Sequence, residues 1–303
     1  MDLLRSQQEP ALPTPPIDEI AKEVVRDVSQ VFKVNSDSWW YWVWQKLLMI
    51  PASKFAEFMR SADLKVGMKS MWEAARDLLH RYSGGCEVDG GLHLPKEGPL
   101  LVISNHPGAT DSLAALALLE RPDVHMVANA RPTLEVLPNT SEHMVYLDKK
   151  TPDRMMSLRN MIHLLEDGQA VIILPRGNIE PEPSLYPGAL ESLKHWSESL
   201  GIFLSRVPDT NLQLILSQNV LTPQAWHHPL TKMGKTESRK HEIAMILQLI
   251  IQSLFNDWKI PIRVTMPDPI PAAALDPTLD PHGLNAAIKD YVGGEMEKTF
   301  KYL

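Results

Sequence analysis

Apolar residues recur every three or four positions through the first quarter of the chain, and this spacing predicts helices. Residues 19–34 show it as an amphipathic helix would. A short aromatic helix is expected over residues 36–50 and should end at Pro51, because proline lacks the N–H that a helix needs and clashes with the preceding turn. Two more helical stretches are expected in residues 55–82, on either side of Gly67.

After residue 85 the pattern changes to short apolar runs of strand length. The segment "CEVDGGLHLP", residues 86–95, predicts two strands joined as a hairpin at Gly90-Gly91. Beyond it, apolar runs alternate with helical patterns. The expected strands are residues 100–105, 124–129, 143–148, 170–175, 212–220 and 260–267. The expected helices are residues 112–120, 152–166, 187–200, 237–257 and 281–300. This alternation predicts an α/β fold with a mixed or mostly parallel sheet flanked by helices.

These patterns divide the chain into three expected regions. Residues 1–18 are rich in proline and predict a disordered lead-in. Residues 19–84 form an N-terminal helical region, and residues 85–303 form the α/β domain. The lead-in shows no secretory signal, and no run of about 18 apolar residues predicts a membrane-spanning helix.

The composition narrows the classes of function. Of the 303 residues, 44% are hydrophobic and 22% charged, which is ordinary for a soluble globular protein. The formal net charge of −7 gives no indication of a nucleic-acid partner. The single cysteine, Cys86, excludes an internal disulfide and a multi-cysteine metal site. We expect no metal and no nucleotide cofactor.

One short segment, "NHPGATD", places candidate catalytic side chains between a buried strand and a buried helix. His106 ends the strand, Asp111 lies in the first turn of the helix, and a Pro-Gly turn allows the carboxylate to fold back toward the imidazole. A carboxylate that accepts from Nδ1–H leaves Nε2 free to act as a base. A histidine that only stabilises the turn explains the same spacing. The same spacing recurs at His143 and Asp148, within an expected strand. Two residues five positions apart on a strand point to opposite faces and lie about 16 Å apart, so we interpret this pair as a non-site.

The segment resembles the signature of the glycerophospholipid acyltransferases, the family that contains lysophosphatidate and glycerol-3-phosphate acyltransferases. Four further blocks are similar to that family and follow in its order: "ARPTLEVLP", "HMVYLDKK", "GQAVIILPRGNIE" and "YPGAL". The similarity extends over roughly residues 85 to 220. It departs from the family at one point, where Pro-Glu-Gly-Thr-Arg is usual and this chain has residues 175–179, Pro-Arg-Gly-Asn-Ile.

The resemblance implies an acyltransferase of phospholipid biosynthesis with an acyltransferase-like fold. A fatty acyl group would pass from acyl-CoA or acyl-carrier protein, the expected co-substrates, to a hydroxyl of a glycerolipid or lysophospholipid. His106 would be the catalytic base and Asp111 the residue that orients it. By block position the substrate-binding residues are Arg131, Lys149 and Arg176. Gly177 and Asn178 are added as substrate-binding residues, because glycine allows a close backbone approach and the backbone N–H groups near Gly177 are candidates to receive the oxyanion. The three basic residues suit a phosphate group, although surface cations often only face solvent.

Four of the eight tryptophans lie in "WWYWVW", residues 39–44. Tryptophan favours membrane interfaces, so Trp39, Trp40, Trp42 and Trp44 are predicted to contact a membrane lipid surface. Packing of this segment against the α/β domain is the alternative. With membrane contact, the protein would be cytoplasmic and peripheral at the inner face of the membrane.

Two other functions remain open from the sequence. An esterase or thioesterase would use the same base with water as acceptor. A non-catalytic lipid-binding module is suggested by Arg176, where the family usually has a carboxylate.

Overall fold

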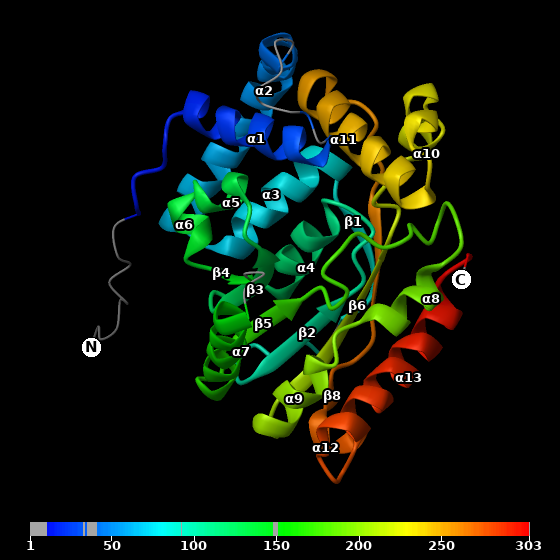
Figure 1. Cartoon of the computed structure of the whole chain (residues 1–303). Coiled ribbons are helices and arrows are strands. Elements are labelled where there is room, and N and C mark those ends of the chain that lie inside the picture. Colours follow the sequence, from blue (N-terminus) through cyan, green and yellow to red (C-terminus); the bar gives the residue numbers. More distant parts are fainter. Residues whose placement is uncertain (1–10, 33, 35–40, 92, 148–150, 303) are drawn as a thin grey trace.

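The computed structural model describes residues 11–32, 34, 41–91, 93–147 and 151–302, and shows a twisted sheet between layers of helices (Figure 1). The strands are β1 Cys86–Gly90, β2 Leu100–Ser104, β3 Val124–Asn129, β4 Met144–Leu147, β5 Ala170–Ile173, β6 Asn211–Gln218, β7 Ile262–Met266 and β8 Ile270–Pro271. Their order is β1-β7-β6-β2-β5-β3-β4, with β8 beside β6. Only the pairs of β6 with β7 and β8 are antiparallel among the described residues, so the predicted mixed, mostly parallel sheet is confirmed.

The helices occupy both faces of this sheet and the region before it. The α-helices are α1 Ile17–Val31, α2 Tyr41–Met68, α3 Met71–Ser83, α4 Asp111–Leu119, α5 Pro132–Glu135, α6 Pro138–Ser141, α7 Thr151–Glu166, α8 Ala189–Ser192, α9 Ser199–Arg206, α10 Pro223–Trp226, α11 Glu237–Phe255, α12 Ala272–Leu275 and α13 Pro281–Thr299. Two 3₁₀ helices, η1 Leu193–His195 and η2 Pro229–Met233, complete them. Among the described residues, no helix is both long enough and apolar enough to cross a bilayer.

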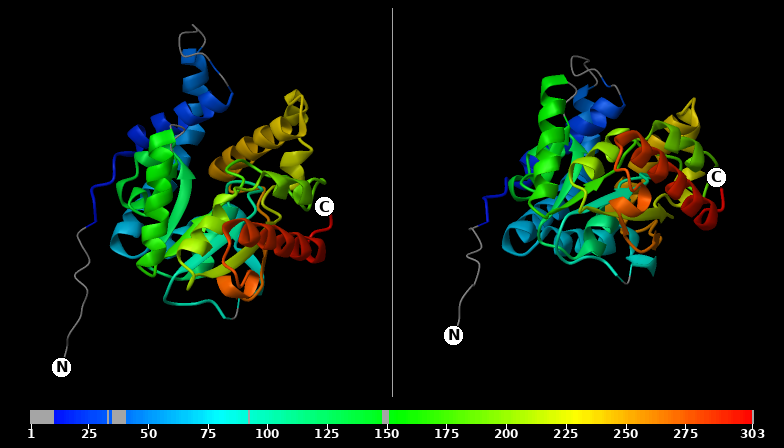
Figure 2. Two further views of the ribbon diagram at one scale, coloured as in Figure 1. Left: turned by 60° about the horizontal axis from the view of Figure 1, so that its bottom comes forward. Right: turned by 90° about the horizontal axis from the view of Figure 1, so that it is seen from below.

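Two apolar cores lie on opposite faces of the sheet because side chains alternate along a strand. In β2, Leu101 and Ile103 join the core formed with α7, α9 and α13, whereas Leu100 and Val102 join the core formed with α3 and α4. All four are fully buried. Figure 2 shows α13 lying along its face of the sheet. This double burial explains why β2 reads as an uninterrupted apolar run.

The prediction that Pro51 ends a helix is wrong. Pro51 lies inside α2, which continues from Tyr41 to Met68. Proline still removes one helix hydrogen bond. Ala52 and Ala56 beyond it pack against α1, next to Ile20, in a small buried cluster. This tertiary packing keeps the chain helical on both sides of the proline.

The predicted hairpin at residues 86–95 is also wrong. β1 pairs in parallel with β7, from Cys86 opposite Ile262 to Gly90 opposite Met266. Gly90 has a φ of 87°, and a Cβ there would lie 2.1 Å from the Met266 carbonyl oxygen. The glycine therefore permits a close approach to a distant strand, and it does not turn the chain back on itself.

The expected helix at residues 187–200 is interrupted. α8 and η1 end before Trp196, whose backbone is extended, and α9 begins only at Ser199. Trp196 is 2% exposed and its indole N–H donates to the Glu180 carboxylate. Burial of this indole with its hydrogen-bond partner outweighs the local helical pattern.

The sheet order determines where the functional side chains meet. β2, β5 and β3 are parallel neighbours, so their carboxyl ends lie at one edge of the sheet. The loops that follow them carry His106, Arg176 and Arg131, respectively. Crevices at this edge are the usual binding sites of open α/β sheets.

Candidate active site

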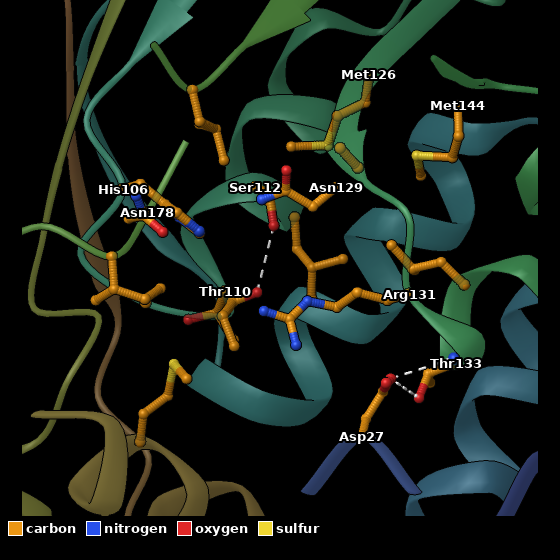
Figure 3. Close-up of a pocket in the computed structure, with 18 of the residues that line it drawn as sticks. Asp27, His106, Thr110, Ser112, Met126, Asn129, Arg131, Thr133, Met144 and Asn178 are labelled. Carbon is orange, nitrogen blue, oxygen red and sulfur yellow. Dashed lines mark hydrogen bonds between the residues drawn. The ribbon is translucent and has the colours of Figure 1, made fainter. Parts of the chain in front are cut away.

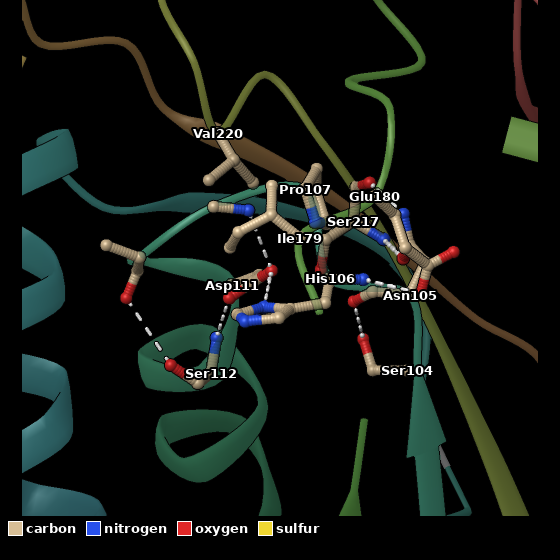
Figure 4. A network of polar contacts seen from close by, with 12 residues as sticks. Ser104, Asn105, His106, Pro107, Asp111, Ser112, Ile179, Glu180, Ser217 and Val220 are labelled. Carbon is tan, nitrogen blue, oxygen red and sulfur yellow. Dashed lines mark hydrogen bonds and ion pairs between the residues drawn. The ribbon is translucent and has the colours of Figure 1, made fainter. Parts of the chain in front are cut away.

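The structure brings His106 and Asp111 together, as the sequence predicted. Nδ1 of His106 lies 2.8 Å from Oδ2 of Asp111 (Figure 4). The same carboxylate accepts from the backbone N–H of Gly108 at 3.1 Å and of Ser112 at 2.6 Å. The carboxylate is an acceptor only, so Nδ1 carries the proton and Nε2 remains available to a ligand. The Asp111 side chain is fully buried, whereas that of His106 is 21% exposed.

The backbone on the amino side of His106 is fixed by two further groups. The Asn105 amide forms two hydrogen bonds with the backbone of Ser217 on β6, at 2.7 and 2.9 Å. Glu180 accepts from the His106 N–H through Oε1 at 3.2 Å, and its own N–H donates to the His106 carbonyl oxygen at 2.7 Å. Figure 4 shows Asn105 and Glu180 near His106, on the side away from Asp111. The imidazole therefore projects from a backbone with little freedom.

Glu180 is a buried carboxyl group, 1% exposed, that the sequence analysis did not include in the site. Besides the His106 N–H it accepts from the Ser192 hydroxyl and from the Trp196 indole N–H at 3.2 Å. Burial raises its pKa, against the lowering effects of these hydrogen bonds and of the charges of His106 and Arg176. The chain thus places a buried carboxyl group beside His106, four positions after Arg176.

Of the five substrate-binding residues predicted from the sequence, two arginines lie at one cavity and Lys149 is not described. Arg131 is the N-cap residue immediately before α5 and points into a cavity beside Thr110 and His106 (Figure 3). Arg176 lies at the same cavity and donates through Nη1 to the Ile179 carbonyl oxygen at 2.9 Å. Lys149 lies outside the described residues.

Gly177 and Asn178 also line this cavity. The N–H of Gly177, which has a φ of 68°, donates to the Leu174 carbonyl oxygen at 2.9 Å and is therefore already used. Within the described residues, the N–H groups of Asn178 and Ile179 have no such partner. Asn129 at the end of β3 connects to the loop that contains Gly177, because its side-chain amide donates to the Gly177 carbonyl oxygen at 3.1 Å.

The cavity in front of His106 has a volume of about 1480 Å³. His106, Arg131 and Arg176 line its polar end, and most of its other lining residues are apolar side chains of the helices α1 to α4, α7 and α11, with Asp27, Arg239 and Glu242 among the exceptions. The apolar side chains include Phe55, Met59, Val66, Met71, Leu116 and Leu249. A site of this shape suits a ligand with a charged end and a long apolar end.

His143 is not near this site. Its Nδ1–H donates to the Val124 carbonyl oxygen at 3.0 Å and its ring lies against that of His125. Asp148, its predicted counterpart, lies outside the described residues.

The four tryptophans predicted to contact a membrane differ in their surroundings. Trp42 is 61% exposed. Trp44 instead packs against α1, where its indole N–H donates to the Ser29 hydroxyl at 3.1 Å and its ring meets Phe32 edge-on. Trp39 and Trp40 lie outside the described residues.

The comparison with family models agrees with the motifs. Residues 85–203 match the family model "Acyltransferase". The crystal structure of the 1-acyl-sn-glycerophosphate (LPA) acyltransferase PlsC from Thermotoga maritima is similar with a TM-score of 0.49 and 11% sequence identity, over 91% of this chain and 97% of that chain. No curated protein matches the chain.

Proposed function

Since residues 85–203 of this chain belong to the acyltransferase family, as the sequence motifs indicated, we propose that the protein transfers a fatty acyl group from a thioester to a hydroxyl of a glycerolipid or lysophospholipid. The thioester is acyl-CoA or acyl-carrier protein. The observation that carries the proposal is the oriented His106–Asp111 pair at the polar end of a large apolar cavity. No metal or other cofactor enters the proposed reaction.

The proposed reaction needs a base and a site for negative charge. Nε2 of His106 takes the proton of the acceptor hydroxyl while the hydroxyl oxygen attacks the carbonyl carbon of the thioester. The N–H groups of Asn178 and Ile179 receive the oxyanion that forms. When the C–S bond breaks, the imidazolium returns the proton to the departing thiolate. The acyl chain occupies the apolar part of the cavity.

Labelled acyl-CoA and a panel of lysolipids test this proposal directly. Purified protein is expected to produce labelled diacyl lipid, and the same incubation without lysolipid should release little free fatty acid. Rapid release of fatty acid without a lysolipid would instead identify the esterase or thioesterase. Lipid binding with no turnover on any donor would identify the non-catalytic module.

Arg176 is proposed to bind an anionic group of the acceptor. It reaches the cavity beside His106, and its planar guanidinium suits a phosphate or carboxylate. Arg176→Ala is expected to raise the acceptor KM about 10- to 100-fold, because a hydrogen bond to a charged group contributes about 1.5–3 kcal/mol. The KM for the thioester should change little, and Arg176→Lys should restore only part of the acceptor binding. Steady-state kinetics with each substrate varied in turn measure this.

The matched control is Arg263→Ala, since Arg263 is paired with Glu87 on the far strands β7 and β1. It should leave both KM values unchanged. Greater transfer to lysophosphatidate by Arg176→Glu than by the native protein would contradict the assignment of Arg176.

The amino end of α2 is proposed to contact the membrane surface from which the lysolipid comes, on the inner face. Val43, Leu47 and Ile50 follow one another at helical spacing on one face, and with Trp42 they are 40–68% exposed. Exposed apolar groups gathered in this way indicate a binding surface. Changing Trp42, Leu47 and Ile50 together to serine is expected to weaken binding to phosphatidylcholine–phosphatidylglycerol vesicles at least about tenfold.

Met68→Ser is the matched control for this surface. Met68 is 62% exposed at the other end of α2, about 39 Å from Trp42 along the helix. Vesicle co-sedimentation should be unchanged in this variant. Equal vesicle affinity of the triple variant and the native protein, both folded, would show that α2 is not the contact.

A further inference from the structure

The turn between His106 and Asp111 is held from outside by His241, a residue of α11 far along the chain. Nε2 of His241 lies 2.8 Å from the Pro107 carbonyl oxygen. The carbonyl can only accept, so Nε2 carries the proton and Nδ1 is the acceptor of the neutral ring. Tyr186 fills that role as donor, with its hydroxyl 2.6 Å from Nδ1. Both imidazole nitrogens are therefore used, and His241 is 1% exposed.

These contacts continue without a break to the catalytic pair. The peptide that joins Pro107 to Gly108 accepts from His241 through its carbonyl oxygen and donates through its N–H to Oδ2 of Asp111. The same Oδ2 accepts from Nδ1 of His106. Hydrogen bonds arranged in series through one peptide polarise each other. The orientation of this peptide thus connects His241 to the atom that orients His106.

The groups behind His241 are packed against one another. The Tyr186 ring stacks on Trp226 with centroids 4.5 Å apart and planes 2° from parallel. Lys240 Nζ lies 3.7 Å from the centroid of the Trp226 ring. On the other side of the turn, a Cβ on Gly108 would lie only 2.6 Å from Val220. The turn is therefore enclosed between Val220 and a buried aromatic group.

The protonation state of His241 suits this role. Burial lowers its pKa to about 4, against the raising effects of the Pro107 hydrogen bond and of Asp111. Burial has the opposite effect on the acidic Tyr186 hydroxyl: it raises the pKa of this group, which therefore stays protonated. At neutral pH the ring is neutral and the direction of each hydrogen bond is fixed.

We propose that His241, oriented by Tyr186, is a positioning residue: it fixes the Pro107–Gly108 peptide so that Asp111 holds the His106 imidazole in its productive orientation. The effect on turnover rests on the proposed acyl transfer. The effect on the His106 ring does not, and it can be measured without a substrate.

Three variants test this proposal on the full chain. His241→Leu removes the hydrogen bond to Pro107, and Tyr186→Phe removes only the donor to Nδ1 while keeping the stacked ring. His241→Gln keeps an amide N–H near the place of Nε2. We expect kcat to fall about tenfold in His241→Leu and about threefold in Tyr186→Phe, with both KM values nearly unchanged, and to recover largely in His241→Gln.

The second readout is the NMR titration of His106 in histidine-labelled protein, assigned by its loss in His106→Gln. A loosened Asp111 contact should lower the midpoint of this titration in His241→Leu and Tyr186→Phe, and less in His241→Gln. Tyr146→Phe is the control, since that hydroxyl meets Ser141 away from the turn. If His241→Leu does not fold, Tyr186→Phe provides the result. An unchanged His106 titration in the folded variants overturns the proposal. If the native protein shows no acyl transfer but the variants do shift the His106 titration, only the proposed function is overturned.

Discussion

Replacing His106 with alanine is expected to lower kcat for acyl transfer by about 10³-fold, within the range of about 10²- to 10⁴-fold for a positioned general base. The pKa of this imidazole is raised above its ordinary value of 6.5: burial lowers it, but the charge of Asp111 and the hydrogen bond to it raise it by more. The base acts when neutral, so the native rate should increase with pH through a midpoint above 6.5. Initial rates with labelled thioester at saturating lysolipid measure both quantities.

The matched control is His143→Ala. Its imidazole has the same five-residue spacing to an aspartate in the sequence, but it bonds the Val124 carbonyl oxygen away from the cavity. This variant should keep near-native kcat and the native pH profile. Near-native turnover by folded His106→Ala, or a large loss in folded His143→Ala, would show that the wrong histidine was chosen.

The sequence was sufficient for the part of the site that is local along the chain. Between β2 and α4, all determinants lie within a few residues: a strand buried on both faces, a Pro-Gly turn, and an acidic residue in the first helical turn. The spacing of His106 and Asp111, together with the Pro-Gly turn between them, therefore predicted their contact. The parallel neighbours β3 and β5 were also recognisable as apolar runs, which placed Arg131 and Arg176 after strands.

The remaining determinants depend on contacts between distant segments, which local patterns do not encode. His241 lies 134 positions from Pro107, and as a single histidine on an otherwise ordinary helix it gave no signal. Parallel pairing of β1 with β7 replaced the expected hairpin for the same reason. Glu180 was visible in the sequence only as a carboxylate displaced from the family's usual position. Its role became apparent once Trp196 and Ser192 were placed beside it.

Glu180→Ala is expected to lower the free energy of unfolding by about 4 kcal/mol. The substitution leaves two buried donors without an acceptor, the His106 N–H and the Trp196 indole N–H, whereas the Ser192 hydroxyl still has the Ala189 carbonyl oxygen as an acceptor. Each unsatisfied buried donor costs about 1–3 kcal/mol. Glu180→Gln should cost less, because its side-chain oxygen can still accept although its NH₂ group faces a donor. Urea denaturation of each variant gives the free energies.

Glu191→Gln is the control for the loss of a carboxylate in the same segment. Glu191 is paired with Lys194 at the surface, with side chains 66% and 70% exposed, so its removal should change stability by less than about 0.5 kcal/mol. Glu180→Gln adds a test of function, because the same carboxyl group fixes the His106 backbone. It should lower kcat of the folded protein while leaving the thioester KM near its native value. If Glu180→Ala unfolds at the same urea concentration as Glu191→Gln, the buried carboxyl group does not hold the loop, and the rigidity of His106 must come from Asn105 and Asp111 alone.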